Sequence, residues 1–224
     1  MSPNEHAFDA ALIAAAMQRA EQSGWRRVTV VDAARDAALP LDEVRQRFPF
    51  RATVLLRLGI LADQAALVDD GTPAGGVRER LFDMLMRRID VLQQYRAGVR
   101  AVLRALPLDP PLAMLLAAAT TDSIRWIAAA AGIDTTGPVG ALRVKGVAAV
   151  WLRCVQAWDR DDSPDLSETM AALDKALDRA EWLAGMLSRP LFDRRGDVGD
   201  AEELDIAPDP LSEPPMPDEP LAPA

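Results

Sequence analysis

The sequence predicts an all-α protein with an N-terminal domain of three to four helices, a C-terminal helical bundle and a disordered acidic tail. Half of the 224 residues are hydrophobic but only 5% are aromatic, and the abundant Ala, Leu, Arg and Met are good helix formers. Apolar residues also recur at helical spacing between capping residues, glycines and prolines. A chain of this length can bury a hydrophobic core in both helical parts.

Residues 1–68 are expected to form the first domain. The apolar pattern of its first helix ends at Ser23-Gly24. The hydroxyl of Thr29 can cap the second helix by accepting a hydrogen bond from a backbone N–H. A turn at residues 37–40 precedes the third helix, which ends before Pro49 because proline disfavours helix in the preceding residue. The four helices are expected at Phe8 to Ser23, Val30 to Arg35, Leu41 to Arg47 and Leu55 to about Ala66.

Turn formers at residues 69–76 mark the expected domain boundary, and residues 77–190 form the second domain. Asp109-Pro110 and Ser163-Pro164-Asp165 each predict a helix start, with a cap followed by proline. The helices are expected from Val77 to Leu106 with a bend near residues 93–95, from Pro110 to Gly132, from Val139 to Trp158, and from Ser163 to Leu187.

The net charge of −9 is concentrated near the C-terminus. From Asp193 onward ten acidic residues face only two arginines, whereas residues 1–60 hold eight arginines and seven acidic residues. The acidity of the whole chain therefore neither excludes nor supports a nucleic-acid partner. Residues 191–224 are rich in proline and poor in large hydrophobic residues, which predicts a disordered, solvated tail. The alternative is a tail that competes with DNA for a basic patch.

Cysteine usage and the N-terminal residues indicate a compartment. Cys154 is the single cysteine, and its apolar neighbours predict a small buried hydrophobe in a reducing environment. The N-terminus lacks the regions of a signal peptide, and no run of about 18 apolar residues predicts a membrane span. We expect a cytoplasmic protein with no integral membrane segment.

No catalytic site is expected. His6 is the only histidine, so one chain can build neither a histidine-based triad nor a multi-histidine metal site. Asp161 and Asp162 could form a carboxylate pair, but adjacent acids before a helix are better explained by helix-start electrostatics. There is no glycine-rich phosphate loop. We therefore expect no enzyme activity, no cofactor and no metal.

Residues 24–51 resemble the helix-turn-helix signature of TetR-type transcriptional regulators, and the resemblance covers residues 8 to about 66. It implies that the third helix enters the major groove of DNA. The matching residues are Gly24, Thr29, Ala34, Ala37, Phe48 and Pro49.

Several positions depart from that signature. Ala38 stands where glycine is common, Arg45 where tyrosine is usual, and Arg51 where lysine is usual. Arginine can still contact phosphate. Asp42 and Glu43 would repel phosphate, although they also stabilise the start of the third helix. The residues expected to contact DNA are Arg26, Arg27, Thr29, Arg45, Arg47 and Arg51.

The second half is similar to a different group of proteins. Residues 130–136, the helix from Ala141 to Trp158 and residues 161–170 resemble the C-terminal region of the lipid-binding accessory proteins of ubiquinone biosynthesis. This match covers about residues 77–187. It implies a TetR-like fold that binds isoprenoid lipids and membranes rather than operators.

A ligand pocket and a dimer interface follow from this architecture. Adaptable Met and large Trp side chains suit an apolar cavity, although ordinary core packing is the better explanation for any single one of them. The expected pocket residues are Met84, Met114, Leu115, Trp126, Trp151 and Cys154. The last two helices would form a four-helix interface with a second copy, with burial inside one chain as the alternative. The expected interface residues are Leu142, Val147, Val150, Met170, Leu173 and Leu177.

Three functions are compatible with these features. The first is a homodimeric, ligand-responsive regulator that binds a double-stranded DNA operator and a small apolar ligand or lipid. The second is a lipid- or isoprenoid-binding accessory protein of quinone metabolism that does not bind DNA. The third is a plain helical interaction module.

Overall fold

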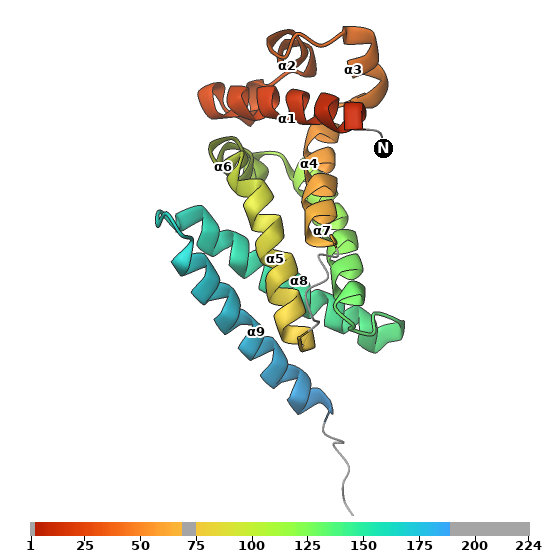
Figure 1. Ribbon diagram of the computed structural model, residues 1–224, viewed down its shortest axis with the longest axis vertical. Helices are drawn as coiled ribbons and strands as arrows, with labels where there is room; N and C mark the ends of the chain where they lie inside the picture. The colour runs from red at the N-terminus through yellow and green to blue at the C-terminus, as the bar shows by residue number, and fades with distance from the viewer. Residues whose placement is uncertain (1–2, 69–74, 189–224) are drawn as a thin grey trace, which may run out of the picture. The chain divides into compact units, whose positions relative to one another are not determined.

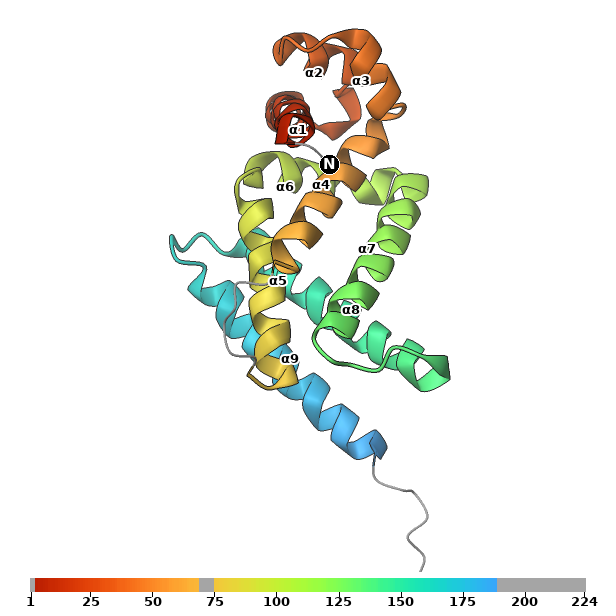
Figure 2. The same ribbon diagram turned by 45° about the vertical axis from the view of Figure 1, so that its right-hand side comes forward.

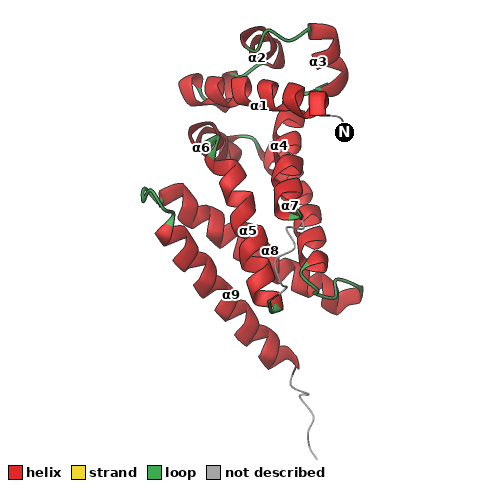
Figure 3. Ribbon diagram, in the orientation of Figure 1, coloured by secondary structure: helices red, strands yellow, loops and turns green. Residues whose placement is uncertain are grey.

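The computed structural model describes residues 3–68 and 75–188, which form helices and connecting loops (Figures 1 and 3). This part has the all-α architecture that the sequence predicts. Most of the expected boundary at residues 69–76, and the whole tail at residues 191–224, lie outside the described residues, so the division into domains stays a prediction. The elements are α1 (Pro3–Ser23), η1 (Trp25–Arg27), α2 (Val30–Asp36), α3 (Leu41–Arg47), α4 (Arg51–Ala66), α5 (Val77–Gln93), α6 (Arg96–Ala105), η2 (Leu106–Leu108), α7 (Pro110–Ala130), α8 (Gly137–Arg160) and α9 (Ser167–Ser188), where η denotes a short 3₁₀ helix.

Side-chain caps explain where α2 and α7 begin. The hydroxyl oxygen of Thr29 accepts a hydrogen bond from the backbone N–H of Asp32 at 3.1 Å. The carboxylate of Asp109 accepts one from the backbone N–H of Leu112 at 3.2 Å. Each bond satisfies a donor that the first turn of a helix leaves unpaired. Both caps were predicted from the sequence and are confirmed.

The helices α1, α2, α3 and α4 form one group, with α2 and α3 farthest from α8 and α9 (Figure 2). A buried acid ties this group together. Asp9 on α1 is 1% exposed, and its carboxylate lies 2.8 Å from Nη2 of Arg47 at the end of α3. Its second oxygen lies 3.9 Å from Nε of Arg57 on α4. Asp9 therefore holds α3 and α4 against α1.

The remaining helices pack against α4 or against one another. This helix packs against both α5 and α7, α7 packs against α8, and α8 packs against α9. The expected bend near residues 93–95 is the break between α5 and α6. The helix α6 turns back to pack against α1. At that crossing a Cβ on Gly98 would lie 2.5 Å from the backbone oxygen of Met17, so only glycine permits the close approach.

The start of α9 differs from the sequence prediction. Residues 163–165 were expected to open this helix, but it begins at Ser167. The preceding residue, Leu166, has a φ of 56°, a left-handed conformation that a continuous helix does not contain. The expected helix start at residues 163–165 is therefore wrong, and these residues belong to a loop.

Asp161 organises that loop. One carboxylate oxygen accepts from the backbone N–H of Ser163 at 2.9 Å, and the other accepts from the backbone N–H and hydroxyl of Thr169 at 2.8 and 2.7 Å. Burial raises the pKa of this carboxyl, but the hydrogen bonds outweigh it and hold the pKa of Asp161 well below its usual value. Asp161 is thus a structural anchor between α8 and α9.

Candidate functional site

The turn between α2 and α3 keeps the geometry that the helix-turn-helix resemblance implies. Ala38 has a φ of 51°, which is the left-handed conformation that glycine adopts most easily. The backbone N–H of Leu39 donates to the carbonyl of Ala34 at 2.9 Å and closes the turn. Alanine therefore adopts the left-handed conformation at the position where the signature commonly has glycine.

The exposed surface of α3 carries charges of both signs. Val44 is buried, whereas Asp42, Glu43 and Arg45 are exposed. The guanidinium of Arg45 donates a hydrogen bond to the carbonyl of Pro49 at 2.7 Å, which holds this side chain near the end of the helix. The acids lie in the first turn, where they stabilise the helix dipole.

The expected DNA contacts fall into two groups. Arg26, Arg27, Thr29 and Arg45 are exposed. The other two are occupied within the chain, because Arg47 is paired with Asp9 and Arg51 donates to the carbonyl of Arg26 at 2.9 Å. Nη2 of Arg51 also lies 3.4 Å from the carboxylate of Asp109. Arg47 and Arg51 therefore position the helices that carry the exposed group.

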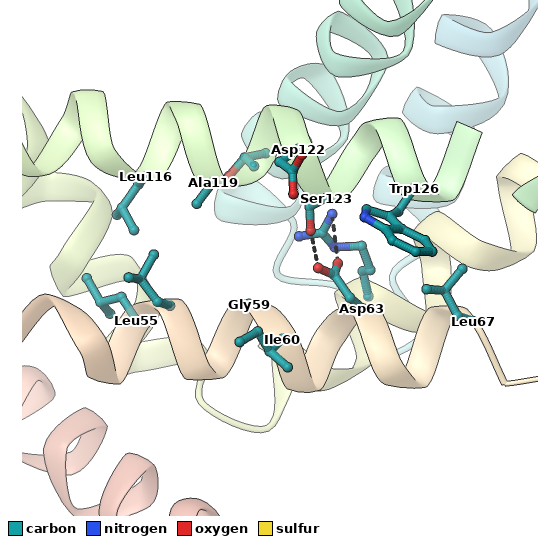
Figure 4. Close-up of a pocket in the computed structure, with 13 residues that line it drawn as sticks. Leu55, Gly59, Ile60, Asp63, Leu67, Leu116, Ala119, Asp122, Ser123 and Trp126 are labelled. Carbon is teal, nitrogen blue, oxygen red and sulfur yellow. Dashed lines mark hydrogen bonds and ion pairs between the residues drawn. The ribbon is translucent and has the colours of Figure 1, made fainter. Parts of the chain in front are cut away.

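A cavity of about 500 Å³ lies between α4 and α7, with one residue contributed by α5 (Figure 4). Its volume is that of a small-molecule site. The walls are mostly apolar, and Trp126, which is 66% exposed, lies on the α7 side. The lining residues are Leu55, Leu56, Gly59, Ile60, Asp63, Leu67, Arg88, Leu116, Ala119, Thr120, Asp122, Ser123 and Trp126.

A polar cluster lies within this cavity and links four helices. Asp63 on α4 accepts a hydrogen bond from the hydroxyl of Ser123 on α7, across the gap seen in Figure 4. Its other oxygen lies 3.3 Å from Nη1 of Arg88 on α5. The guanidinium of Arg88 stacks over Trp151 of α8, 4.5 Å from the ring centre. Arg88 is 4% exposed, and this burial lowers the pKa of its guanidinium while Asp63 acts in the opposite direction.

The expected pocket residues lie in different places. Trp126 lines the cavity, and Trp151 contacts Arg88. Met114 and Leu115 are exposed on α7 and are not among the lining residues. Met84 is half-buried on α5, and Cys154 is fully buried on α8, where burial raises the pKa of its thiol to about 12.

The sequence interpretation missed the polar residues of the cavity, although one signal was present. Arg88 follows Leu81 and Leu85 on the apolar stripe of α5. Arginine is seldom fully buried without a partner, so a charge on such a stripe indicates a buried polar site. Asp63 and Ser123 give no comparable signal, because each is a small polar residue on a helix whose neighbours are unknown from sequence.

Most of the expected dimer residues are covered by their own chain. Val147, Val150, Leu173 and Leu177 are buried on α8 and α9, which pack against each other and against α5, and Met170 is half-buried. Leu142 is exposed. Among residues 137–160 and 167–185, the large apolar residues left exposed are Val139, Leu142, Leu152, Trp182 and Leu183.

Two further properties concern membranes and metals. Within residues 3–68 and 75–188, α7 is the one helix with the length and hydropathy of a membrane span, and 22% of the tested stretch is buried. A single such helix is weak evidence, since core helices reach similar values. In the same ranges no group of three or more His, Cys, Asp or Glu side chains is placed to hold a metal ion.

The arrangement of these helices is similar to two solved structures. One is a TetR transcriptional regulator from Nitrosomonas europaea, with a TM-score of 0.65 and 20% identity, over 78% of this chain and 98% of that one. The other is a TetR transcriptional regulator from Rhodococcus sp., with a TM-score of 0.51 and 16% identity, over 79% and 96%. The chain has the TetR-type fold. No family model matches the sequence, and no curated protein does.

The helices α2 and α3 span the residues at which the sequence predicts the second and third helices, and the cavity lies between α4 and α7. The resemblance of residues 77–187 to lipid-binding accessory proteins is not tested by these similarities. It stays a prediction.

Proposed function

We propose that this chain is a ligand-responsive transcriptional regulator of the cytoplasm, which binds a DNA operator as a homodimer and has no catalytic activity. The observation that carries this proposal is the combination of an exposed helix-turn-helix and a ligand-sized cavity in one TetR-type fold. A ligand that binds α4 and α7 differently in two arrangements of these helices would shift the spacing of the two recognition helices.

The exposed cations set the expected strength of DNA binding. Arg26, Arg27 and Arg45 are exposed in each protomer, with one nitrogen of Arg45 donating to the carbonyl of Pro49, so a dimer would make up to about six phosphate contacts. The logarithm of the binding constant should then fall with the logarithm of salt concentration with a slope of about −5. Arg47 and Arg51 act indirectly, because their guanidinium groups hold α3 and α4 in place.

A gel-shift titration with the protein's own upstream DNA, at two salt concentrations, tests this proposal. The double variant Arg26→Ala/Arg27→Ala should weaken binding and reduce the magnitude of the salt slope. Arg125→Ala is the matched control, because Arg125 is exposed on α7 and pairs with Asp122 of its own helix. The absence of a gel shift at both salt concentrations, or an equal loss of DNA affinity in both variants, would contradict the proposal that this chain is a regulator.

The homodimer is proposed to form through the exposed apolar residues of α8 and α9. Leu142 and Leu152 on α8 are 53% and 56% exposed, and Trp182 on α9 is 64% exposed. An isologous contact would cover both helices at once. Leu142→Asp/Leu152→Asp should shift the molar mass measured by light scattering from dimer to monomer, whereas Leu108→Asp, an exposed residue of η2, should not. A wild-type monomer would contradict the interface.

A second candidate is the lipid- or isoprenoid-binding accessory protein that does not bind DNA. Two observations favour it: the acids Asp42 and Glu43 are exposed on α3, and the cavity walls include the exposed apolar residues Ile60, Leu67 and Trp126. Solvent extraction of the purified protein followed by mass spectrometry tests it. Recovered lipid together with no DNA shift would support this candidate over the regulator.

A further inference from the structure

The cavity between α4 and α7 has room for a ligand that the chain itself does not fill. Gly59 lies on its α4 wall, and a Cβ at that position would meet nothing within 4 Å. Glycine inside a helix is less favourable than alanine. The residue that leaves this space open therefore lowers the intrinsic stability of α4. The apolar walls around this space would hold a hydrocarbon body.

The polar cluster of the cavity has no net charge. Asp63 and Arg88 carry opposite charges 3.3 Å apart, and Ser123 is neutral. The next charge among the lining residues is Asp122, whose side chain is 68% exposed and therefore well solvated. A charged head group placed beside Asp63 and Arg88 would leave one unit of charge without compensation in a poorly solvated site.

The same polar cluster contains hydrogen-bonding groups that have no partner. Among the described residues, Nε and Nη1 of Arg88 and Oδ1 of Asp63 have no hydrogen-bond partner, although these atoms are buried. The ion pair between Nη1 and Oδ1 is close but lacks hydrogen-bond geometry. Unpaired buried donors and acceptors are unfavourable, so a group that accepts from Arg88 or donates to Asp63 would be stabilised here.

We propose that the cavity binds an uncharged, largely apolar molecule whose one polar group, an amide, carbonyl or hydroxyl, lies at the Asp63–Arg88 pair. An amide meets both requirements, because its oxygen accepts from Arg88 and its N–H donates to Asp63. A carboxylate would add a second negative charge beside Asp63, and an ammonium group would lie against Arg88. This inference names the ligand class of the proposed regulator and rests on that function for its biological role.

Three probes with ten-carbon chains test the proposal by isothermal titration calorimetry: decanamide, decanoate and decyltrimethylammonium. The wild-type protein should bind decanamide at least about tenfold more tightly than either charged probe. An affinity ratio of this size is the order of magnitude of the repulsion between two like charges in partly solvated surroundings. Tighter binding of decanoate or decyltrimethylammonium, or no binding of decanamide up to its solubility limit, would overturn the proposal.

Variants locate the preference at the ion pair. Asp63→Asn keeps the shape but leaves Arg88 without its counter-charge, so the ratio of decanoate to decanamide affinity should rise by about tenfold or more. Asp83→Asn removes an exposed acid of α5 that is not among the lining residues and should leave this ratio unchanged. Gly59→Leu should fill the space and abolish binding of decanamide. An unchanged ratio in folded Asp63→Asn would refute the role of the pair.

Circular dichroism establishes whether each variant is folded, and if Asp63→Asn is not folded the wild-type probe series alone decides. DNA binding is measured separately by the gel shift. Neutral-probe selectivity without a DNA shift would overturn only the regulator, whereas a DNA shift without neutral-probe selectivity would overturn only the ligand class.

Discussion

Gly98 lies in the first turn of α6 where this helix crosses α1, and we expect Gly98→Ala to destabilise the protein. The added methyl group would lie 2.5 Å from the backbone oxygen of Met17 and 2.8 Å from its Cα. Because carbon atoms pack best at about 3.5–4.0 Å, the two helices would have to part by about 0.7 Å or more. These are backbone atoms, so a change of side-chain rotamer cannot relieve the contact.

The magnitude follows from two opposing effects. Replacing glycine by alanine in a helix favours folding by up to about 1 kcal/mol, whereas overpacking of this kind costs about 1–3 kcal/mol. Since the obstructing atoms are backbone, the upper part of that range applies, and the net loss should be about 1–2 kcal/mol. Gly59→Ala is the matched control, because a Cβ there meets nothing within 4 Å, and it should gain up to about 1 kcal/mol.

Urea denaturation followed by circular dichroism measures both variants. The free energy of unfolding should be about 2–3 kcal/mol lower for Gly98→Ala than for Gly59→Ala. Equal stability of the two variants would refute the argument that glycine is required where α1 crosses α6.

Three further predictions concern single residues. Ala38→Gly should stabilise the protein by about 1 kcal/mol in the same assay, since Ala38 has a φ of 51°, whereas Ala37→Gly, where φ is −83°, should destabilise it. Because the pKa of Asp161 is lowered in the folded state, its contribution to stability is present above the unfolded value near 3.9 and lost as the pH falls below it. The stability difference between wild type and Asp161→Asn should therefore be largest near neutral pH and shrink below about pH 4, and a difference independent of pH would contradict this. The Cys154 thiol, with its pKa raised to about 12 by burial, should react with a thiol reagent only after denaturant is added, and fast labelling of the native protein would show that α8 opens.

Local chemistry explains why the helices could be predicted from the sequence. Thr29 and Asp109 cap helices through their own backbone neighbours, so their role is readable without knowing the fold. The start of α9 could not be read in this way. It depends on Asp161, which bonds to Thr169 eight residues later in a loop whose path the sequence does not specify.

The candidate sites were less predictable because they depend on which helices meet. The apolar spacing of Leu173 and Leu177 correctly indicates a covered stripe, yet both residues are already buried within the same chain, where α9 packs against α8 and α5. Arg47 and Arg51 match the residue type that binds phosphate, but their guanidinium groups are occupied by Asp9 and by backbone carbonyls. Residue type and helical spacing do not reveal such partners.

The contact of Arg51 with Asp109 joins the first residue of α4 to the cap of α7, so the two walls of the cavity are fastened at one end. Asp63 lies twelve residues further along α4, about 18 Å from that fastening at the rise of an α-helix. A ligand that widened the gap by about 1 Å at Asp63 would therefore tilt α4 by about 3° around Arg51. Arg51 also donates to the carbonyl of Arg26. The residue around which α4 would tilt is therefore also bonded to the segment just before α2, and the tilt angle of α4 would increase with the size of the ligand.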